Sequence, residues 1–190
     1  MADNKPFKVE RKGYVAWLVF NRPEARNTMD GDFFQGLVDH MEQFGRDPEV
    51  RVVVIRAEGK SFTAGLDLKW AGGLLTGAVG ADSRETMRRE IMALQESMNA
   101  VERCPKPVIA AIHSHCIGGG IDLACACDIR LCTEDAVFSI RETRLAIIAD
   151  LGTLQRLPHI IGGGRARELA LTGRDFTGRE ALEMGFVTTL

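Results

Sequence analysis

Short β-branched runs alternate with amphipathic helical segments along this chain of 190 residues, and that alternation limits the folds open to it. Each run is apolar, four to six residues long and bounded by turn-forming residues, as expected for a buried strand. Strands that alternate with helices form a layered α/β architecture. We therefore predict an α/β fold with strands at residues 15–20, 51–56, 107–112, 129–132 and 136–140.

Helical spacing marks the segments between and after these strands. Phe34 and Phe44 belong to an apolar face with spacings of three and four, and Asn27 or Thr28 is expected to cap that helix. The glycine-rich residues 71–80 are expected to form a mobile loop that leads into a long helix. The further predicted helices lie within residues 87–101, 151–160, 165–171 and 179–184.

Charge and cysteine content exclude several classes of protein. With 24 Lys and Arg against 26 Asp and Glu, the net charge of −2 gives no broad positive field for nucleic acid or anionic lipid. No apolar run approaches the length of a transmembrane helix, and no secretory signal is visible. The odd count of five cysteines indicates free thiols in a reducing compartment. We expect one domain over residues 1–190 and a cytoplasmic location, with an organellar matrix left open.

Two segments share one design, in which a strand runs into small residues and then into a helix. They are residues 61–68 and residues 115–123, which contain the run Gly118-Gly119-Gly120. Helix N-termini expose unpaired N–H groups, and two such turns brought together could direct two donors at one oxygen atom. The alternative is that the glycines serve only tight turns and helix packing. Neither segment matches a phosphate-binding glycine loop.

Three carboxylates lie close to these turns in the predicted arrangement. Asp122 follows Gly119 by almost one helical turn, and Glu142 follows a strand. Asp150 has apolar neighbours, which raise the pKa of an acid and suit it to carry protons. Each has an alternative: Glu142 in an exposed ion pair with Arg141 or Arg144, Asp150 as a helix cap, and Asp122 as a hydrogen-bond partner of backbone amides.

Other polar residues are expected to be structural. Asp128 and Arg130 look like an ion pair. His113 and His115 would lie on one side of an extended segment, but no third ligand is apparent, so no metal site is predicted.

At this point the sequence resembles the crotonase superfamily, the enoyl-CoA hydratases and isomerases. The resemblance rests on residues 21–27, 61–68, 107–128 and 154–158, in family order. It implies a spiral core of ββα units that binds an acyl-CoA thioester. Family members continue with C-terminal helices that cover the acyl pocket and build a trimer, and we expect a chain that ends at Leu190 to lack them. The partners expected are an acyl-CoA thioester and, if that region is present, further copies in a homotrimer or dimer of trimers.

The resemblance also implies roles for individual residues. The N–H groups of Leu66 and Gly119 would hold the thioester oxygen, and Ala25 and Arg26 would lie near the nucleotide end of CoA. Coenzyme A would enter as part of the substrate, with no separate cofactor. The residues implied to line the bend of the CoA chain and the oxyanion hole are Ala64, Gly65, Leu66, Asp67, Leu68 and Gly119.

The acids indicate a subgroup. The trio Asp122, Glu142 and Asp150 looks like that of the Δ3,5-Δ2,4-dienoyl-CoA isomerases. Carried over, Asp150 would be the base at C2, Glu142 the acid at C6, and Asp122 a supporting group. One alternative is an enoyl-CoA hydratase or another crotonase reaction, with water held between Asp122 and Glu142. The other is a crotonase-fold binding protein without turnover.

Overall fold

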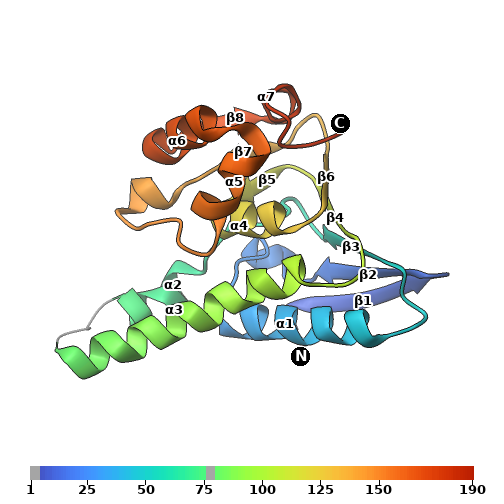
Figure 1. The fold of residues 1–190 in the computed structure, drawn as a ribbon, viewed down its shortest axis with the longest axis horizontal. Helices are drawn as coiled ribbons and strands as arrows, with labels where there is room; N and C mark the ends of the chain where they lie inside the picture. The colour runs from blue at the N-terminus through green and yellow to red at the C-terminus, as the bar shows by residue number, and fades with distance from the viewer. Residues whose placement is uncertain (1–4, 76–79) are drawn as a thin grey trace.

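The structure is a computed structural model that describes residues 5–75 and 80–190 (Figure 1). Its larger sheet has the strand order β1-β2-β3-β4-β6, in which β1 is antiparallel to β2 and the remaining neighbours are parallel. Parallel neighbours need crossover connections, and the helices between the strands supply them. The strands are β1 (Phe7–Lys12), β2 (Val15–Phe20), β3 (Val52–Ala57), β4 (Val108–Ile112) and β6 (Ile129–Cys132).

A second, three-stranded sheet lies beyond the end of the first and has the order β5-β7-β8. It consists of β5 (His115–Ile117), β7 (Val137–Ser139) and β8 (Asp175–Thr177). β5 is parallel to β7, and β7 is antiparallel to β8. Because β5 follows β4 after a turn at Ser114, the chain passes from one sheet to the other immediately before the glycine run.

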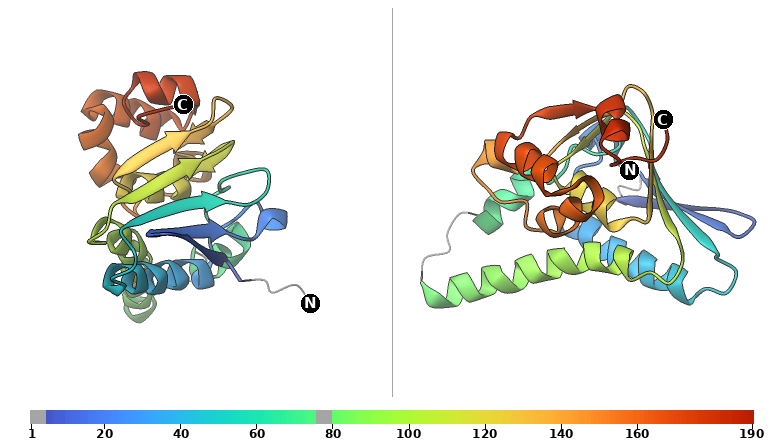
Figure 2. Two further views of the ribbon diagram at one scale, coloured as in Figure 1. Left: turned by 90° about the vertical axis from the view of Figure 1, so that its right-hand side faces the viewer. Right: turned by 45° about the horizontal axis from the view of Figure 1, so that its top comes forward.

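Helices cover both sheets (Figures 1 and 2). Two long helices lie side by side beneath the larger sheet, α1 (Gly31–Arg46) and α3 (Ala81–Glu102). The helix α4 (Gly119–Ala126) is buried along its whole length between the layers. The other helical elements are η1 (Pro23–Ala25), α2 (Leu68–Leu75), η2 (Glu142–Leu145), α5 (Thr153–Ile161), α6 (Gly163–Thr172) and α7 (Gly178–Glu183).

Two aromatic clusters anchor the layers. Phe20 contacts both Phe33 of α1 and Phe62, with ring centroids 5.0 and 5.1 Å apart. In the smaller sheet, Phe138 stacks on Phe176 at 5.2 Å, and Phe186 closes the cluster. Both clusters belong to one continuous hydrophobic core, and the turns that follow β3 and β4 lie against it.

All five predicted strands and the α/β class are confirmed, with small shifts at strand ends. β1, β5 and β8 were not predicted. Two of them have only three residues, too few for a hydrophobic pattern to show. β1 has one buried residue, Phe7, and lies at a sheet edge.

Two predictions about the ends of helices are wrong. The cap of α1 is Asp30, whose carboxylate accepts the Phe33 N–H, because the Asn27 side chain instead donates to the carbonyls of Glu58 and Ser61. The predicted loop at 71–80 is helical as far as residue 75, in α2; residues 76–79 lie outside the described part of the chain. The helix α1 is therefore capped by neither Asn27 nor Thr28, and the segment from residue 71 to residue 75 is not a loop.

Asp128 and Arg130 do not form the expected ion pair. The Asp128 carboxylate accepts the Val108 N–H at 2.7 Å. The buried Arg130 guanidinium donates instead to backbone carbonyls of Ala124, Cys127 and Phe186, which satisfies its donors inside the core.

Candidate active site

A cavity of about 210 Å³ lies where the glycine turns, the first turn of α4 and residues 141–151 meet. It is lined by all three predicted acids and by both residues whose N–H groups were expected to hold an oxygen. These five residues are Leu66, Gly119, Asp122, Glu142 and Asp150. Residues separated by up to 84 positions in the sequence therefore share one small, mostly apolar space.

Backbone pairing brings the two turns together. Thr63 forms an isolated parallel bridge with Cys116, which lies in β5. The Thr63 N–H donates to the His115 carbonyl at 2.9 Å, and the Ile117 N–H donates to the Thr63 carbonyl at 3.2 Å. The first turn thus acts as an additional strand beside β5, and both turns reach the cavity at the same level.

The glycines allow this close approach. Gly65 has φ +85, and a Cβ there would lie 2.6 Å from the Ile117 carbonyl oxygen and 3.5 Å from the Gly119 nitrogen. Within the described residues, the N–H groups of Leu66 and Gly119 donate no hydrogen bond, whereas the adjacent N–H groups of Asp67 and Gly118 donate to Met29 and Ser139. Two neighbouring free donors in a buried site can stabilise an oxygen that develops negative charge.

Thr63 is a residue in these turns that the sequence argument did not single out. It is fully buried, its hydroxyl donates to the Asn27 carbonyl at 2.7 Å, and it accepts the Gly65 N–H at 3.0 Å. The Asn27 side chain in turn binds the carbonyl of Ser61 at the start of the same turn. The first turn is therefore fixed by buried side-chain bonds, which are costly to leave unmade.

Asp122 lies on α4, and only 1% of its surface is exposed. Burial raises its pKa to about 6, and the negative charge of Asp150 adds to the rise. Its Oδ1 accepts the Thr153 N–H at 2.7 Å, at the start of α5. The expected alternative, a bond from Asp122 to a backbone amide, is thus present in addition to its place on the cavity.

Glu142 begins η2 and turns its carboxylate to the cavity. Burial, followed by the charge of Asp122, raises its pKa to about 7. Its Oε2 is buried and has no hydrogen-bond partner in the described residues. The exposed ion pair offered as the alternative is wrong: Arg141 pairs with Asp175 at 2.6 Å, and among the described residues no ion pair joins Glu142 to Arg144. Gly118 makes room for this acid, since a Cβ there would lie 2.9 Å from Glu142 Oε1.

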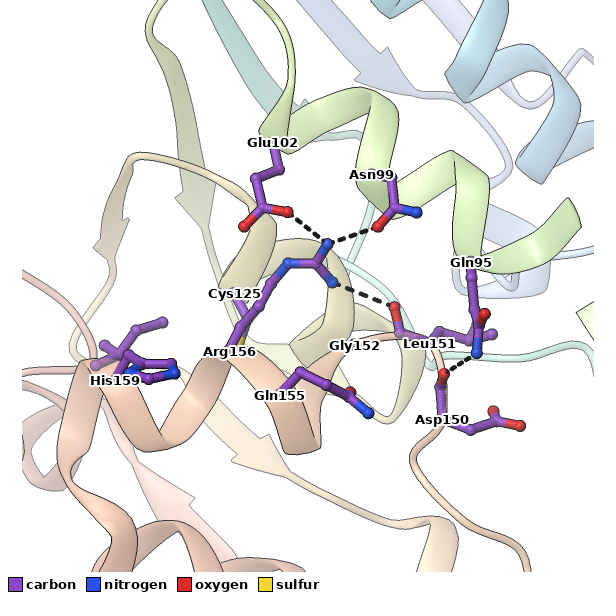
Figure 3. Close-up of a pocket in the computed structure, with 11 residues that line it drawn as sticks. Gln95, Asn99, Glu102, Cys125, Asp150, Leu151, Gly152, Gln155, Arg156 and His159 are labelled. Carbon is purple, nitrogen blue, oxygen red and sulfur yellow. Dashed lines mark hydrogen bonds and ion pairs between the residues drawn. The ribbon is translucent and has the colours of Figure 1, made fainter. Parts of the chain in front are cut away.

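Asp150 is partly buried, and burial raises the pKa of its carboxyl. It does not cap the following helix as the alternative held: α5 starts at Thr153, and its N-cap is Gly152. The Asp150 backbone is held from outside, because Gln95 of α3 donates its side-chain amide to the Asp150 carbonyl at 2.7 Å (Figure 3). In that view the Asp150 carboxylate points away from Arg156.

A second group of polar bonds surrounds the next peptide. Arg156 of α5 donates to the Leu151 carbonyl at 3.4 Å, to Asn99 at 2.8 Å and to Glu102 at 2.7 Å (Figure 3). These bonds join α5 to α3 across a polar cleft of about 630 Å³. Nothing in the sequence pattern indicated that Gln95 would contact Asp150, which lies 55 positions further along the chain. The bond from Arg156 to Leu151 was not indicated either.

Two further cavities adjoin the one that holds the acids. An apolar cavity of about 250 Å³ shares Leu66 and Asp150 with it and continues between α2 and α3, past Met87 and Ile91. A polar cavity of about 600 Å³ shares Ala64 and is also lined by Lys60, Arg26 and His115. The acids therefore lie between an apolar end and a basic end, as an elongated ligand with one charged end would require.

Of the remaining predicted site residues, some line the cavity and others lie outside it. Gly65 and Leu68 line the cavity, Leu68 at the start of α2. Ala25 is exposed at the end of η1 and lines none of the three cavities. Asp67 accepts the N–H groups of Lys69 and Trp70 and so caps the start of α2.

The histidines make local polar contacts: His113 Nε2 lies 3.0 Å from the Gly59 carbonyl, and His115 Nδ1 lies 3.0 Å from Ser114 Oγ. In residues 5–75 and 80–190, no cluster of three or more potential metal ligands occurs. The five cysteines carry free thiols. No helix in the same residues is long and apolar enough to cross a bilayer.

Comparison with known proteins gives consistent results. Residues 10–190 match the Enoyl-CoA hydratase/isomerase family. The chain is 45% identical to the peroxisomal Delta(3,5)-Delta(2,4)-dienoyl-CoA isomerase of Arabidopsis thaliana over 99% of this chain and 70% of that protein. It is 44% identical to the mitochondrial Delta(3,5)-Delta(2,4)-dienoyl-CoA isomerase of Dictyostelium discoideum over 98% of this chain and 66% of that protein.

The fold is also shared with solved structures. The enoyl-CoA hydratase of Bacillus anthracis superposes with a TM-score of 0.87 at 35% identity, over 97% of this chain and 69% of that one. The crotonase-like fold expected from the resemblance is thereby confirmed. The chain spans about two thirds of the length of the proteins it matches here.

Proposed function

The chain belongs to the enoyl-CoA hydratase/isomerase family, and from this we propose that it converts 3,5-dienoyl-CoA to 2,4-dienoyl-CoA. One observation carries the proposal: three acids with raised pKa values line the same cavity as two free backbone N–H groups. A double-bond shift over this distance needs separate proton carriers and a stabilised thioester enolate, and the cavity offers both.

The three adjoining cavities suit the parts of an acyl-CoA. In the proposed complex, the CoA portion crosses the polar cavity near Arg26 and Lys60, where cations favour its phosphates. The thioester then passes Ala64 and reaches the N–H groups of Leu66 and Gly119. The acyl chain continues past Asp150 into the apolar cavity beside α3.

The proposed reaction balances with two proton transfers. The Asp150 carboxylate removes a proton from C2, and the electron pair spreads through the diene to the thioester oxygen, which the two N–H groups stabilise. Glu142, protonated, then donates its proton to C6 as the double bonds settle at C2 and C4. A pKa of about 7 keeps a good fraction of Glu142 protonated near neutral pH. Exchange with water restores both acids.

Asp122 supports the two transfers in this scheme. It is held by the Thr153 N–H, and its negative charge raises the pKa of Glu142. No cofactor takes part in the proposed reaction, because the CoA enters as part of the substrate.

The second candidate is hydration of a 2-enoyl-CoA. It is favoured by one feature, the shared cavity of Asp122 and Glu142, between which a water molecule could be held. Purified chain should be assayed with 3,5-dienoyl-CoA and with 2-enoyl-CoA. Conversion of the dienoyl substrate supports isomerisation, and formation of a 3-hydroxyacyl product supports hydration. Binding of either thioester without turnover would favour a non-catalytic role.

Location and assembly remain predictions. The names of the two relatives place one in peroxisomes and the other in mitochondria. By analogy, we propose the matrix of an organelle, which the sequence left open beside the cytoplasm. A homotrimer or dimer of trimers stays an expectation, and light scattering on the purified protein tests it.

A further inference from the structure

Asp150 lies in a segment without regular secondary structure. Residues 146–152 form no regular secondary structure, and the Asp150 N–H bonds only locally, to the Ile148 carbonyl at 2.9 Å. Its neighbours Ala149 and Leu151 are buried in the core and anchor the path of the chain, whereas Ile148 is 70% exposed. The orientation of the Asp150 peptide between them depends on the bonds that its own N–H and carbonyl make.

Gln95 supplies that contact. Its side-chain amide extends from α3 and donates to the Asp150 carbonyl at 2.7 Å (Figure 3). α3 is a helix of 22 residues whose nearby residues Ser97 and Met98 are fully buried, so Gln95 starts from a rigid support. A bond to the carbonyl of Asp150 itself fixes the peptide plane next to the Cα that carries the carboxylate.

Resting on the isomerase function proposed above, we propose that Gln95 is a positioning residue that directs the Asp150 carboxylate toward C2 of the bound acyl chain. Gln95 and Asp150 line the polar cleft, whereas Asp122 and Glu142 line the smaller cavity with Asp150 and without Gln95. Gln95 therefore acts through Asp150 and does not line the cavity in which the acyl chain reacts. Small displacements of a catalytic group are sufficient to slow a proton transfer, since reaction requires contact distance and alignment.

The bonds to residues 151–153 show why loss of the Gln95 side chain should affect the Asp150 peptide in particular. Arg156 binds the Leu151 carbonyl, but at 3.4 Å, and its shorter bonds go to Asn99 and Glu102. Asp122 holds the Thr153 N–H, three residues further on. Loss of the Gln95 amide would leave residues 151–153 anchored while the Asp150 peptide is free to rotate.

The test compares Gln95→Met with Gln155→Met in the full chain. Met keeps the length of the Gln side chain and removes the donor. Gln155 lies in the same cleft, and it makes none of the bonds to residues 150 and 151 drawn in Figure 3, so its variant is the matched control. With 3,5-dienoyl-CoA, Gln95→Met should lower kcat by about 10- to 100-fold, with KM within about threefold. Gln155→Met should keep both constants near the wild-type values.

A kinetic isotope effect separates positioning from a loss of folded protein. With substrate deuterated at C2, Gln95→Met should show an isotope effect on kcat as large as the wild type or larger, because removal of the C2 proton is the step that becomes slow. The bound stoichiometry of a CoA thioester should be unchanged. Loss of kcat in parallel with lost binding sites, or an equal loss in Gln155→Met, would overturn the proposal.

A second variant covers failure of the first to fold. Gln95→Glu keeps the size of the side chain and, as a carboxylate, cannot donate to the carbonyl, so it should also lose kcat. If either variant folds and turns over within twofold of wild type, Gln95 does not position Asp150. If the wild-type chain itself does not isomerise 3,5-dienoyl-CoA, the proposed function fails first, and the two failures are thereby distinguished.

Discussion

The two sides of the cavity are built in different ways. The amide side, residues 61–66 and 115–120, is mostly buried, carries glycines at positive φ, and is held together by backbone bonds and by the Thr63 hydroxyl. The acid side consists of Asp122 on α4 and of residues 141–151, whose only regular element is the short helix η2. It is held by bonds from Gln95 of α3 to Asp150 and from Arg156 of α5 to Leu151, and by the bond between Asp122 and Thr153. The donors are thus held by backbone pairing between two glycine-containing turns. The proton carriers are held mainly by side-chain bonds that involve helices. We expect changes on the first side to cost both stability and activity, and changes on the second to cost activity alone.

The largest combined effect, on activity and on stability together, is expected from Gly65→Ala. The new Cβ would lie 2.6 Å from the Ile117 carbonyl oxygen, so the turns must separate and the Leu66 N–H must move. We expect a loss of about 10²- to 10³-fold in kcat, as for removal of one oxyanion donor, together with a lower melting temperature. Steady-state kinetics and thermal unfolding measure the two losses.

Gly162→Ala is the control for backbone strain. Gly162 has φ +83, close to the φ +85 of Gly65, but its Cβ would meet no atom within 4 Å. It should lose about 1–3 kcal/mol of stability with kcat unchanged. Equal kcat in the two variants would show that the amide side does not depend on the close approach of its turns.

Asp150→Asn tests the acid side. The amide cannot take a proton from C2, so kcat should fall by about 10²- to 10⁴-fold. Stability should stay equal or rise, because burial already disfavours the charged form of Asp150. A variant that unfolds more readily than wild type would contradict the division between the two sides, and one that isomerises normally would remove Asp150 from the mechanism.

The pH dependence follows from Glu142. Its pKa is raised from 4.5 to about 7, so the folded state binds this proton more tightly than the unfolded state does. The group therefore lowers stability as pH rises from about 4.5 to about 7, and has no further effect above that range. As the proton donor, Glu142 should also make activity fall about tenfold per pH unit above 7.

Glu142→Gln measures the contribution of Glu142 to the pH dependence of stability. It should remove the loss of stability between pH 5 and pH 8 that Glu142 causes, as followed by denaturant unfolding at both values. If the pH dependence of wild type and variant is the same, Glu142 does not have the raised pKa on which its role depends.

The smallest effect is expected at the edge of the acid side. Ile148 is 70% exposed but lines both the acid cavity and the apolar one. Ile148→Ser should change stability by no more than about 0.5 kcal/mol. Its KM should rise more for long acyl chains than for short ones. A large loss of stability would mean that residues 141–151 are packed tightly, which contradicts the proposed difference between the two sides of the cavity.

The same division explains what the sequence could predict. The glycines of the two turns are local features, so the residue types alone suggested a pair of donors and left open that the glycines serve only tight turns. The assignment of the donors to Leu66 and Gly119 came from the family resemblance. The acids were identified as candidates, but their alternatives could be decided only by tertiary structure: Arg141 pairs with Asp175, and α5 begins at Thr153. Gln95 and Thr63 gave no signal, because a single polar residue in a helix or turn has many ordinary roles.

The central claim is that Asp150 and Glu142 transfer protons to and from an acyl thioester whose oxygen is hydrogen-bonded by the Leu66 and Gly119 N–H groups. Incubation of 3,5-dienoyl-CoA with the chain in D₂O, followed by NMR of the product, tests it most directly. The account predicts 2,4-dienoyl-CoA with one deuterium at C6, delivered by Glu142 after exchange with solvent. A hydroxylated product, or a 2,4-dienoyl product without deuterium at C6, would contradict it.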